Sequence, residues 1–423
     1  MAIDTPAKIA IIGAGPIGLE AALYARYLGY EVEVFDIDPA PASGVRNYGG
    51  LPMYTPFGMN RSSLGLAALQ AQHDNYKPPP DDAVLAYSEW YESYLLPLAN
   101  SDLIVDSLRL QTLVISAGKV ELTKTDFPTG EYNRGNWDFR LMVGKELTRQ
   151  SFATADILFD CGGLFAKKRA MGHGGLKALG EDILNFTIGT SNDAPPTPRN
   201  FSRFLGNSIL VVGDDHFAIF TILSLAELAK KNPNTRITWV TRKSAEDAPH
   251  GPLLYDEHDP LPERAKFIFA ANELVRSGQV TWWPETWIEA IESAGEQWRV
   301  TFSGAREESH EFYQILNHNS GVPSHAELRE LVLDLCPRSE APRPFSESLL
   351  ARKSTLDIRY PASSPAALIT SEPNFYILGA KSFGRLPGFL YQHGLRQIRD
   401  VFTIIGDRAD LDLYAKYDSQ AKL

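Results

Sequence analysis

Apolar and polar positions follow a pattern that occurs twice along the chain. Residues 8–12 (KIAII) form an apolar run of buried-strand length, and 31–35 (EVEVF) form a second one. The residues between them have the apolar spacing of a helix, at Leu19, Ala22, Leu23, Ala25 and Leu28. Residues 208–243 repeat this order of strand, turn, amphipathic helix and strand. The pattern predicts two βαβ units and parallel sheets.

Other segments indicate how these units belong to domains. ADILFDCGG (155–163) is typical of a buried strand that ends in a glycine pair, a natural exit from a first domain. Residues 310–322 are expected to close a second domain, and 374–407 to form a strand, turn and long helix of the first. We therefore expect an α/β protein with two Rossmann-like domains, the second inserted in the first. The first would comprise 1–165 and 323–423, and the second 166–322.

Several further elements are predicted by the same periodicities. Residues 84–98 have helical spacing, and 110–125 with 137–144 are typical of hairpin strands. Short strands within 279–302 are expected to return to the sheet of the second domain. The segment 337–365, rich in Pro and Ser, is expected to be a loop or an exposed lid.

The first turn carries glycines at positions that suit a bound nucleotide. Gly13 permits a tight strand-to-helix turn, Gly15 lacks the Cβ that would keep a pyrophosphate from the backbone, and Gly18 lets the helix lie close to the strand. The second strand ends at Asp36, where a carboxylate accepts hydrogen bonds from ribose hydroxyls. A glycine-rich turn in an ordinary parallel sheet is the alternative. Strand, helix, second strand and acid together favour a dinucleotide with an unphosphorylated ribose, as in FAD or NAD.

The second turn departs from this motif. Gly213 holds the first glycine position, but Asp214 and Asp215 follow it, and carboxylates beside a phosphate are unfavourable. The second strand ends in Arg242 and Lys243, which a 2′-phosphate would need, although solvated strand-end charges explain them equally well. The turn leaves nicotinamide binding undecided, with a slight preference for NADPH over NADH.

Composition excludes several classes of protein. A formal net charge of −11 argues against a nucleic-acid surface, and no apolar run is long enough to cross a bilayer. The two cysteines, Cys161 and Cys336, are too far apart in sequence for a C-x-x-C pair and too few for a disulfide framework. We see no metal-ligand cluster, and expect a cytoplasmic protein without a membrane span.

The chain resembles the two-dinucleotide-domain flavoproteins, which include flavin monooxygenases and thioredoxin-reductase-like enzymes. The resemblance rests on four segments in this order: GAGPIGLEAA, FDCGG, the degraded second βαβ unit and YILGAKSFG. The resemblance implies that the turn Gly13–Gly18, with Pro16 and Ile17, would hold the FAD pyrophosphate, and Asp36 its ribose. It also implies contacts to FAD from the loop that carries Arg46 and from Gly162. The resemblance also implies a contact from Gly379, and the free amides at the amino end of the long helix near Gly388 would face an anionic ligand group. Two departures are that the family's closing Gly-Asp pair is here Gly379-Ala380, and its nicotinamide-site glycine is here Asp215.

The resemblance implies an FAD-dependent oxidoreductase of small organic molecules. Disulfide reductases of the family need a redox cysteine pair, which this chain lacks, so a monooxygenase that uses NAD(P)H is the leading hypothesis. A substrate-reduced oxidase or dehydrogenase, and a non-catalytic FAD-binding module, are the alternatives. No catalytic acid or base is assigned, and a homodimer stays open.

Overall fold

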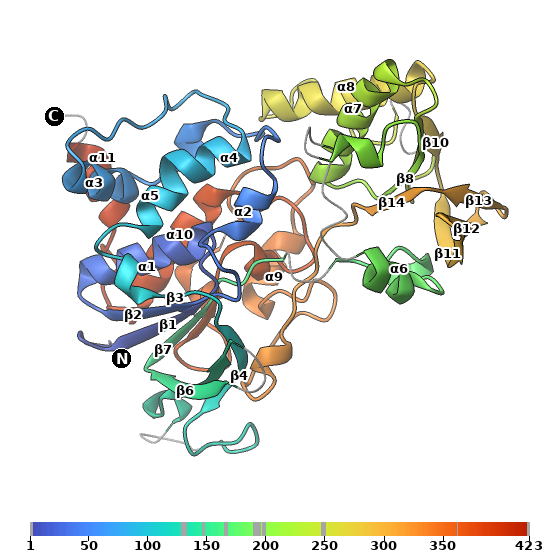
Figure 1. The fold of residues 1–423 in the computed structure, drawn as a ribbon. Coiled ribbons are helices and arrows are strands. Elements are labelled where there is room, and N and C mark those ends of the chain that lie inside the picture. The colour runs from blue at the N-terminus through green and yellow to red at the C-terminus, as the bar shows by residue number, and fades with distance from the viewer. Residues whose placement is uncertain are drawn as a thin grey trace. The chain divides into compact units, whose positions relative to one another are not determined.

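The chain divides into two compact units in a computed structural model (Figure 1). Unit 1 comprises Met1–Ala166 and Pro323–Leu423, and unit 2 comprises Lys167–Val322. The structure describes residues 3–127, 133–145, 149–164, 168–188, 196, 200–246, 251–361 and 363–420. Each unit is described below by itself.

Unit 1 is built on a parallel sheet. Its described strands have the order β15 (Phe375–Ile377), β7 (Ile157–Asp160), β1 (Lys8–Ile12), β2 (Glu31–Phe35) and β3 (Leu108–Arg109). The apolar runs pair in register, so that Phe35, Ile12, Asp160 and Ile377 form one row across four strands. The residues that follow these four positions therefore share the carboxyl edge of the sheet, where α/β proteins bind ligands.

Two helices of unit 1 begin near this edge. Helix α1 (Pro16–Leu28) joins β1 to β2 and ends at Gly29, whose φ of 92° is left-handed. Helix α10 (Tyr391–Ile405) follows β15 and buries Ile398, Val401 and Phe402. Both contribute to one apolar core with β1 and β7. Further helices of this unit are α2 (Ser43–Asn47), α3 (Ser63–Gln72), α4 (Tyr87–Trp90), α5 (Leu96–Ala99), α9 (Arg343–Leu350) and α11 (Leu413–Gln420).

The predicted helix over 84–98 is formed, with an irregular middle turn. A π-helical turn, η2 (Tyr91–Leu95), separates α4 from α5. Trp90, Tyr91 and Tyr94 are buried there, as expected of core aromatic residues. The 337–365 segment was expected to be a loop or an exposed lid, but it contains the helix α9, whose Phe345 is fully buried.

A small antiparallel sheet also belongs to unit 1. Strands β4 (Leu113–Lys119) and β5 (Phe139–Gly144) form the predicted hairpin, and β6 (Gln150–Ala155) pairs with β5. Phe139 and Leu141 pack with Leu158 and Phe375 of the parallel sheet in a second core cluster. Strand β6 was not predicted because most of its side chains are exposed and give no apolar alternation.

Unit 2 repeats the βαβ architecture around a second parallel sheet. Its described strands have the order β10 (Thr281–Trp283), β9 (Arg236–Val240), β8 (Ser208–Val212) and β14 (Gln314–Asn317). Helix α7 (His216–Lys231) joins β8 to β9 and packs with α8 (Pro262–Arg276). Helix α6 (Glu181–Ile188) precedes them in the chain.

A separate antiparallel sheet completes unit 2. It consists of β11 (Thr286–Ala294), β12 (Gln297–Gly304) and β13 (Ser309–Phe312), and buries Trp298 and Phe302. The prediction that 279–302 returns to the parallel sheet is therefore wrong for β11 and β12, and holds only for β10. Antiparallel neighbours joined by the tight turn at Gly295 need no crossover, which the apolar pattern alone does not reveal.

Candidate functional site

The turn between β1 and α1 is held closed by two of its glycines. Gly13 has a φ of 97°, and a Cβ placed there would lie 2.8 Å from the carbonyl oxygen of Cys161. A Cβ on Gly18 would lie only 1.9 Å from the carbonyl oxygen of Gly13. Both positions therefore require glycine for internal packing, which is the role that their spacing predicts.

Gly15 differs from these two glycines because its space is open. It is the N-cap of α1 in extended conformation, with φ −73° and ψ −179°. Apart from Gly15 and its two chain neighbours, no described residue has an atom within 4 Å of a Cβ built there, and no side chain caps the helix at this position. The free amides at a helix start attract an anion, so the open space at Gly15 fits a phosphate group.

Asp36 lies beside this turn with its carboxylate turned toward the backbone. Its Oδ2 accepts a hydrogen bond from the Ala14 amide at 2.6 Å, and its Oδ1 accepts one from the Asp38 amide at 2.9 Å. Burial raises the pKa of Asp36, and the two amide bonds act in the opposite direction. Each carboxylate oxygen has a second lone pair, so Asp36 can still accept a ribose hydroxyl.

The other residues expected at FAD lie around the same edge of the sheet. Gly162 follows β7 and donates its amide to Asp160 Oδ1 at 3.1 Å. Gly379 follows β15 with a φ of 72°, and its amide donates to Gln397 Oε1 at 2.9 Å. A Cβ on Gly379 would lie 3.3 Å from Ile17, so this segment contacts the first turn of α1.

Arg46 and Gly388 lie less directly at the turn. Arg46 is an exposed residue of α2, a helix that is joined to the turn through the Ala42 amide and the Ala14 carbonyl at 2.9 Å. Gly388 has a φ of 92° and precedes α10, and a Cβ there would lie 2.9 Å from Arg352. The structure thus brings Gly13–Gly18, Asp36, Gly162 and Gly379 together, with Arg46 and Gly388 on neighbouring segments.

A buried ion-pair cluster at this edge was not predicted from the sequence. Lys381 Nζ lies 2.5 Å from Asp160 Oδ2 and 2.9 Å from Glu327 Oε1. Burial alone would lower the pKa of Lys381, but the two carboxylates raise it above its usual value. Its partners are more than fifty residues distant in sequence, so no local pattern shows the cluster. The lysine side chain ties β7, β15 and the segment at Glu327 together.

The corresponding turn of unit 2 has nearly the same backbone but a different N-cap. A Cβ on Gly213 would lie 2.4 Å from the carbonyl oxygen of His318, as Gly13 meets Cys161 in unit 1. Asp215 is the N-cap of α7 with φ −77° and ψ 176°, close to the angles of Gly15. Its Oδ1 accepts hydrogen bonds from the Phe217 and Ala218 amides, both at 2.9 Å. The carboxylate therefore bonds to the amides that a pyrophosphate would use.

The electrostatics of this turn follow from burial. Burial raises the pKa of Asp215 to about 7, although the amide bonds and Lys168 oppose the shift. His318 Nδ1 lies 3.9 Å from Asp215 Oδ1, and its Nε2 lies 2.8 Å from Thr221 Oγ1. Burial lowers the pKa of His318 well below its usual range, so the imidazole is neutral at pH 7.

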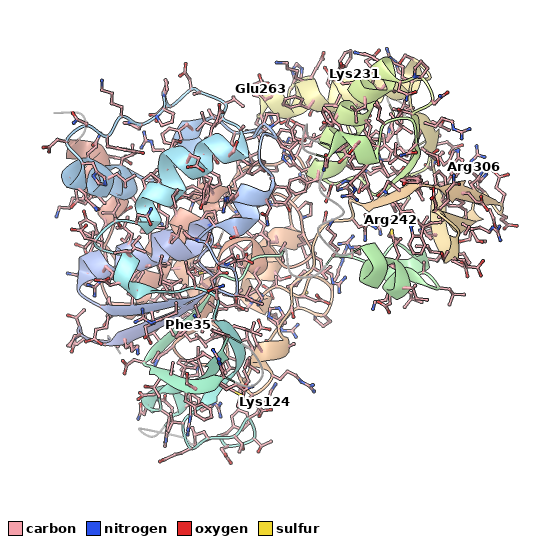
Figure 2. The ribbon with its side chains drawn as sticks, in the orientation of Figure 1. Phe35, Lys124, Lys231, Arg242, Glu263 and Arg306 are labelled. Carbon is pink, nitrogen blue, oxygen red and sulfur yellow. The ribbon has the colours of Figure 1, made fainter. Side chains whose placement is uncertain are left out.

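Arg242 and Lys243 follow β9 at the same edge of the sheet. Lys243 Nζ lies 3.2 Å from Asp214 Oδ2, and Arg242 is exposed (Figure 2). The pairing with Asp214 neutralises part of the charge that a 2′-phosphate would meet. Arg242 is thus the better candidate of the two to contact such a phosphate.

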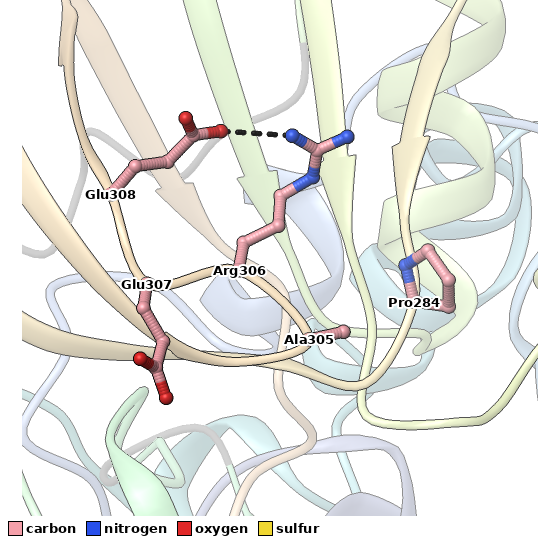
Figure 3. Close-up of a pocket in the computed structure, with 5 residues that line it drawn as sticks. All are labelled: Pro284, Ala305, Arg306, Glu307 and Glu308. Carbon is pink, nitrogen blue, oxygen red and sulfur yellow. Dashed lines mark hydrogen bonds and ion pairs between the residues drawn. The ribbon is translucent and has the colours of Figure 1, made fainter.

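A surface hollow lies beside this segment on the β10 side of unit 2. Pro284, Ala305, Arg306, Glu307 and Glu308 line it, and Arg306 pairs with Glu308 at 2.9 Å (Figure 3). The Glu285 amide next to it donates to the Lys243 carbonyl at 3.1 Å. The hollow contains none of the predicted site residues. Among the residues that the structure describes, no helix has the length and apolar character to cross a membrane, and no acidic, His or Cys cluster suits a metal.

Comparisons with known proteins agree with this architecture. Residues 2–121 match the family described as alanine dehydrogenase/PNT, C-terminal domain. A 50-residue segment is 42% identical to a subunit PreT homologue of NAD-dependent dihydropyrimidine dehydrogenase from Salmonella typhi. That match spans 12% of this chain and 12% of the relative.

The likeness to solved structures extends over nearly the whole chain. Bacillithiol disulfide reductase Bdr (YpdA) from Bacillus cereus aligns with a TM-score of 0.64 at 13% identity, over 95% of this chain and 99% of that one. The Kutzneria sp. 744 ornithine N-hydroxylase, described with reduced FAD, NADP+ and L-ornithine, aligns with a TM-score of 0.56 at 13% identity. That alignment covers 95% of this chain and 99% of the other. The chain has the two-domain fold of these proteins. The expected resemblance and fold class are therefore confirmed.

Proposed function

We propose that the protein is an FAD-dependent oxidoreductase. The observation that carries this proposal is the open space at Gly15, at the uncapped start of α1 and beside Asp36. The space there is free for an anion at the helix start, and Asp36 binds the amide of Ala14, the residue that precedes Gly15. In this proposal unit 1 is the FAD-binding domain, in two parts (1–165 and 323–423), and unit 2 (166–322) is a domain like those that bind NAD(P)H.

The turn residues would hold FAD through its adenosine diphosphate half. Gly15, Pro16 and Ile17 would face the pyrophosphate, and Asp36 the ribose hydroxyls. Because Asp36 follows β2, the flavin half would extend the other way, toward Gly162 after β7 and Gly379 after β15. Bound FAD would supply electron transfer between a donor and an acceptor, while the protein orients and shields the reacting groups.

We infer a monooxygenase-like reaction on a small organic substrate, with NADPH or NADH as electron donor. The likeness to the ornithine N-hydroxylase supports this proposal. Disulfide reduction through an internal dithiol is disfavoured by the chemistry of the chain. Its two cysteines are both free, and burial raises the pKa of Cys161 well above its usual value. A thiolate is the form that attacks a disulfide, so Cys161 is a poor nucleophile.

A second candidate, an oxidase or dehydrogenase that its own substrate reduces, is favoured by one observation. Asp215 already satisfies the two amides at the start of α7, so a nicotinamide pyrophosphate has to displace its carboxylate. The two turns differ at this position while their backbone angles agree. Reduction by the substrate would need no nucleotide in unit 2.

The test is the absorption spectrum of the purified protein, followed by anaerobic stopped-flow mixing. A flavin spectrum, or uptake of added FAD, supports the FAD proposal, and colourless protein that takes up no FAD refutes it. Rapid bleaching of the bound flavin by NADPH or NADH supports the first candidate. Bleaching by neither nucleotide, with turnover of an organic substrate in oxygen, supports the second.

A further inference from the structure

A buried carboxyl group lies inside the first helix of the candidate FAD site. Glu20 of α1 is fully buried, and its Oε1 accepts hydrogen bonds from the hydroxyls of Tyr94 at 2.5 Å and Tyr391 at 2.6 Å. Burial raises the pKa of Glu20, and the bonds from Tyr391, Tyr94 and Ser62 act against that shift. A buried carboxyl group is costly, and Oε2 of Glu20 has no hydrogen-bond partner among the described residues, so the two bonds to Oε1 are its main compensation.

The partners of Glu20 come from distant parts of unit 1. Tyr94 lies in the π-helical turn η2. Its hydroxyl oxygen also accepts a hydrogen bond of 3.0 Å from the amide of Ser62, which is the N-cap of α3. A Cβ on Gly65 of α3 would lie 2.1 Å from the Tyr94 hydroxyl, so the approach is close. π-helical turns re-aim side chains and occur often at functional sites. Here the turn directs a hydroxyl at Glu20.

The bond to Tyr391 has a different consequence, because Tyr391 is the first residue of α10. Helix α10 lies on α1 (Figure 1), and a Cβ on Gly394 would be 2.2 Å from Cδ1 of Ile17. The two helices thus touch at Ile17 in the first turn of α1, and the Glu20–Tyr391 bond joins them one turn further along. Both helices direct their amino ends, with partial positive charge, to the carboxyl edge of the sheet.

We propose that Glu20 is a positioning residue for FAD, which acts through Tyr391 to fix the start of α10 relative to the pyrophosphate turn of α1. This inference rests on the FAD site proposed above. The hydrogen bond between Glu20 and Tyr391 holds α10 against α1. In this proposal α10 begins beside the flavin half of FAD, and α1 begins at the pyrophosphate. The pair Glu20–Tyr94 links the same carboxyl group to η2 and, through the Ser62 amide, to the start of α3.

Two matched variants separate positioning from stability. Tyr391→Phe and Tyr94→Phe each remove one buried hydroxyl that donates to the same oxygen of Glu20. We expect both to lower the melting temperature of the FAD-free protein, Tyr94→Phe at least as much as Tyr391→Phe, because it also leaves the Ser62 amide without its acceptor. Only Tyr391→Phe is expected to weaken FAD binding, by up to about tenfold as for one lost buried hydrogen bond, and to shift the visible flavin spectrum. Titration of FAD-free protein with FAD measures the affinity.

Substitutions of Glu20 complete the test. Glu20→Gln keeps an oxygen that accepts both hydroxyls, so its FAD affinity is expected to stay within about twofold of wild type. Glu20→Leu removes both bonds and is expected to reproduce the weaker FAD binding and the spectral shift of Tyr391→Phe. If Tyr391→Phe and Tyr94→Phe change FAD affinity and spectrum equally, or not at all, the positioning role is refuted while the FAD site stands. If the wild-type protein takes up no FAD, the proposed function and this inference both fail.

Discussion

The variant Gly15→Asp tests the candidate pyrophosphate turn most directly, because unit 2 contains a natural example of it. Gly15 and Asp215 are N-caps with almost the same backbone angles, and Asp215 accepts the two helix amides at 2.9 Å each. An aspartate at position 15 is therefore expected to accept the amides of Ile17 and Gly18 without backbone strain. It would place a carboxylate where the FAD pyrophosphate has to lie.

The magnitude follows from the charges. Two unit charges about 4 Å apart repel by about 4 kcal/mol at an effective dielectric constant of about 20. At about 1.4 kcal/mol for each tenfold change, FAD binding should weaken by about a thousandfold. The stability of the folded protein should not fall, since aspartate is as good an N-cap as glycine or better by about a few tenths of a kcal/mol. We therefore expect colourless Gly15→Asp protein that melts at or slightly above the temperature of FAD-free wild type.

The assay is FAD titration of the FAD-free protein, followed by flavin fluorescence, with thermal melting in parallel. Gly18→Ala is the contrasting control, because its Cβ would lie 1.9 Å from the Gly13 carbonyl oxygen and should lower the melting temperature even without FAD. Gly15→Val fills the same open space without a charge and should also lose FAD. If Gly15→Asp binds FAD within about tenfold of wild type, the turn is not the pyrophosphate site and the electrostatic reasoning is wrong.

Three further predictions concern the remaining charged groups. Asp215→Gly should lower the Michaelis constant for NADPH in anaerobic flavin reduction, and Arg242→Ala should erase the preference for NADPH over NADH. Unchanged kinetics in both variants would mean that unit 2 has no working nicotinamide site at this turn. Because the pKa of Asp215 is raised to about 7 in the folded state, the folded protein binds its proton more tightly than the unfolded chain does, so Asp215 should make stability fall as pH rises from about 4 to about 7. Urea unfolding across this range should show a flatter profile for Asp215→Asn, which keeps an N-cap oxygen, and identical profiles would contradict the raised pKa of Asp215. Lys381→Met leaves the carboxylates of Asp160 and Glu327 without their cation and should cost about 3–5 kcal/mol in urea unfolding, whereas a loss below about 1 kcal/mol would show that the cluster is solvated.

The sequence predicts the local parts of this protein well. Strand, glycine turn, helix and terminal acid of the first βαβ unit lie within about thirty residues, and each glycine has a steric reason that a sequence can express. Gly13 and Gly18 pack as expected, and Gly15 is open as expected. The insertion of one Rossmann-like unit in another follows from the order of such units along the chain.

Contacts between distant segments were not predictable in the same way. Glu20 is one polar residue in an apolar helix, and its partners lie 74 and 371 residues away. Lys381 joins carboxylates at 160 and 327, and β11 pairs with β12 in a sheet of its own. Only the N-cap role of Asp215 had a local signal, since aspartate before an amphipathic helix is a preferred N-cap. The sequence indicated repulsion of a phosphate there, and the structure adds that the carboxylate replaces it.

The two turns have similar backbones but differ in whether a side chain caps the helix that follows. Both use a glycine with positive φ to bring the turn against the neighbouring strand, Gly13 against Cys161 and Gly213 against His318. Both helices then present amides that need an acceptor, because the first turn of a helix has none of its own. In unit 2 the side chain of Asp215 is that acceptor, and in unit 1 Gly15 has no side chain to supply one. No side chain caps the first amides of α1 among the described residues, so water or an anion is the expected acceptor there, whereas Asp215 accepts the amides of Phe217 and Ala218 in α7. This difference is the physical reason to place the tightly bound dinucleotide in unit 1, and to expect a nucleotide in unit 2 to bind weakly and leave readily, as a co-substrate does.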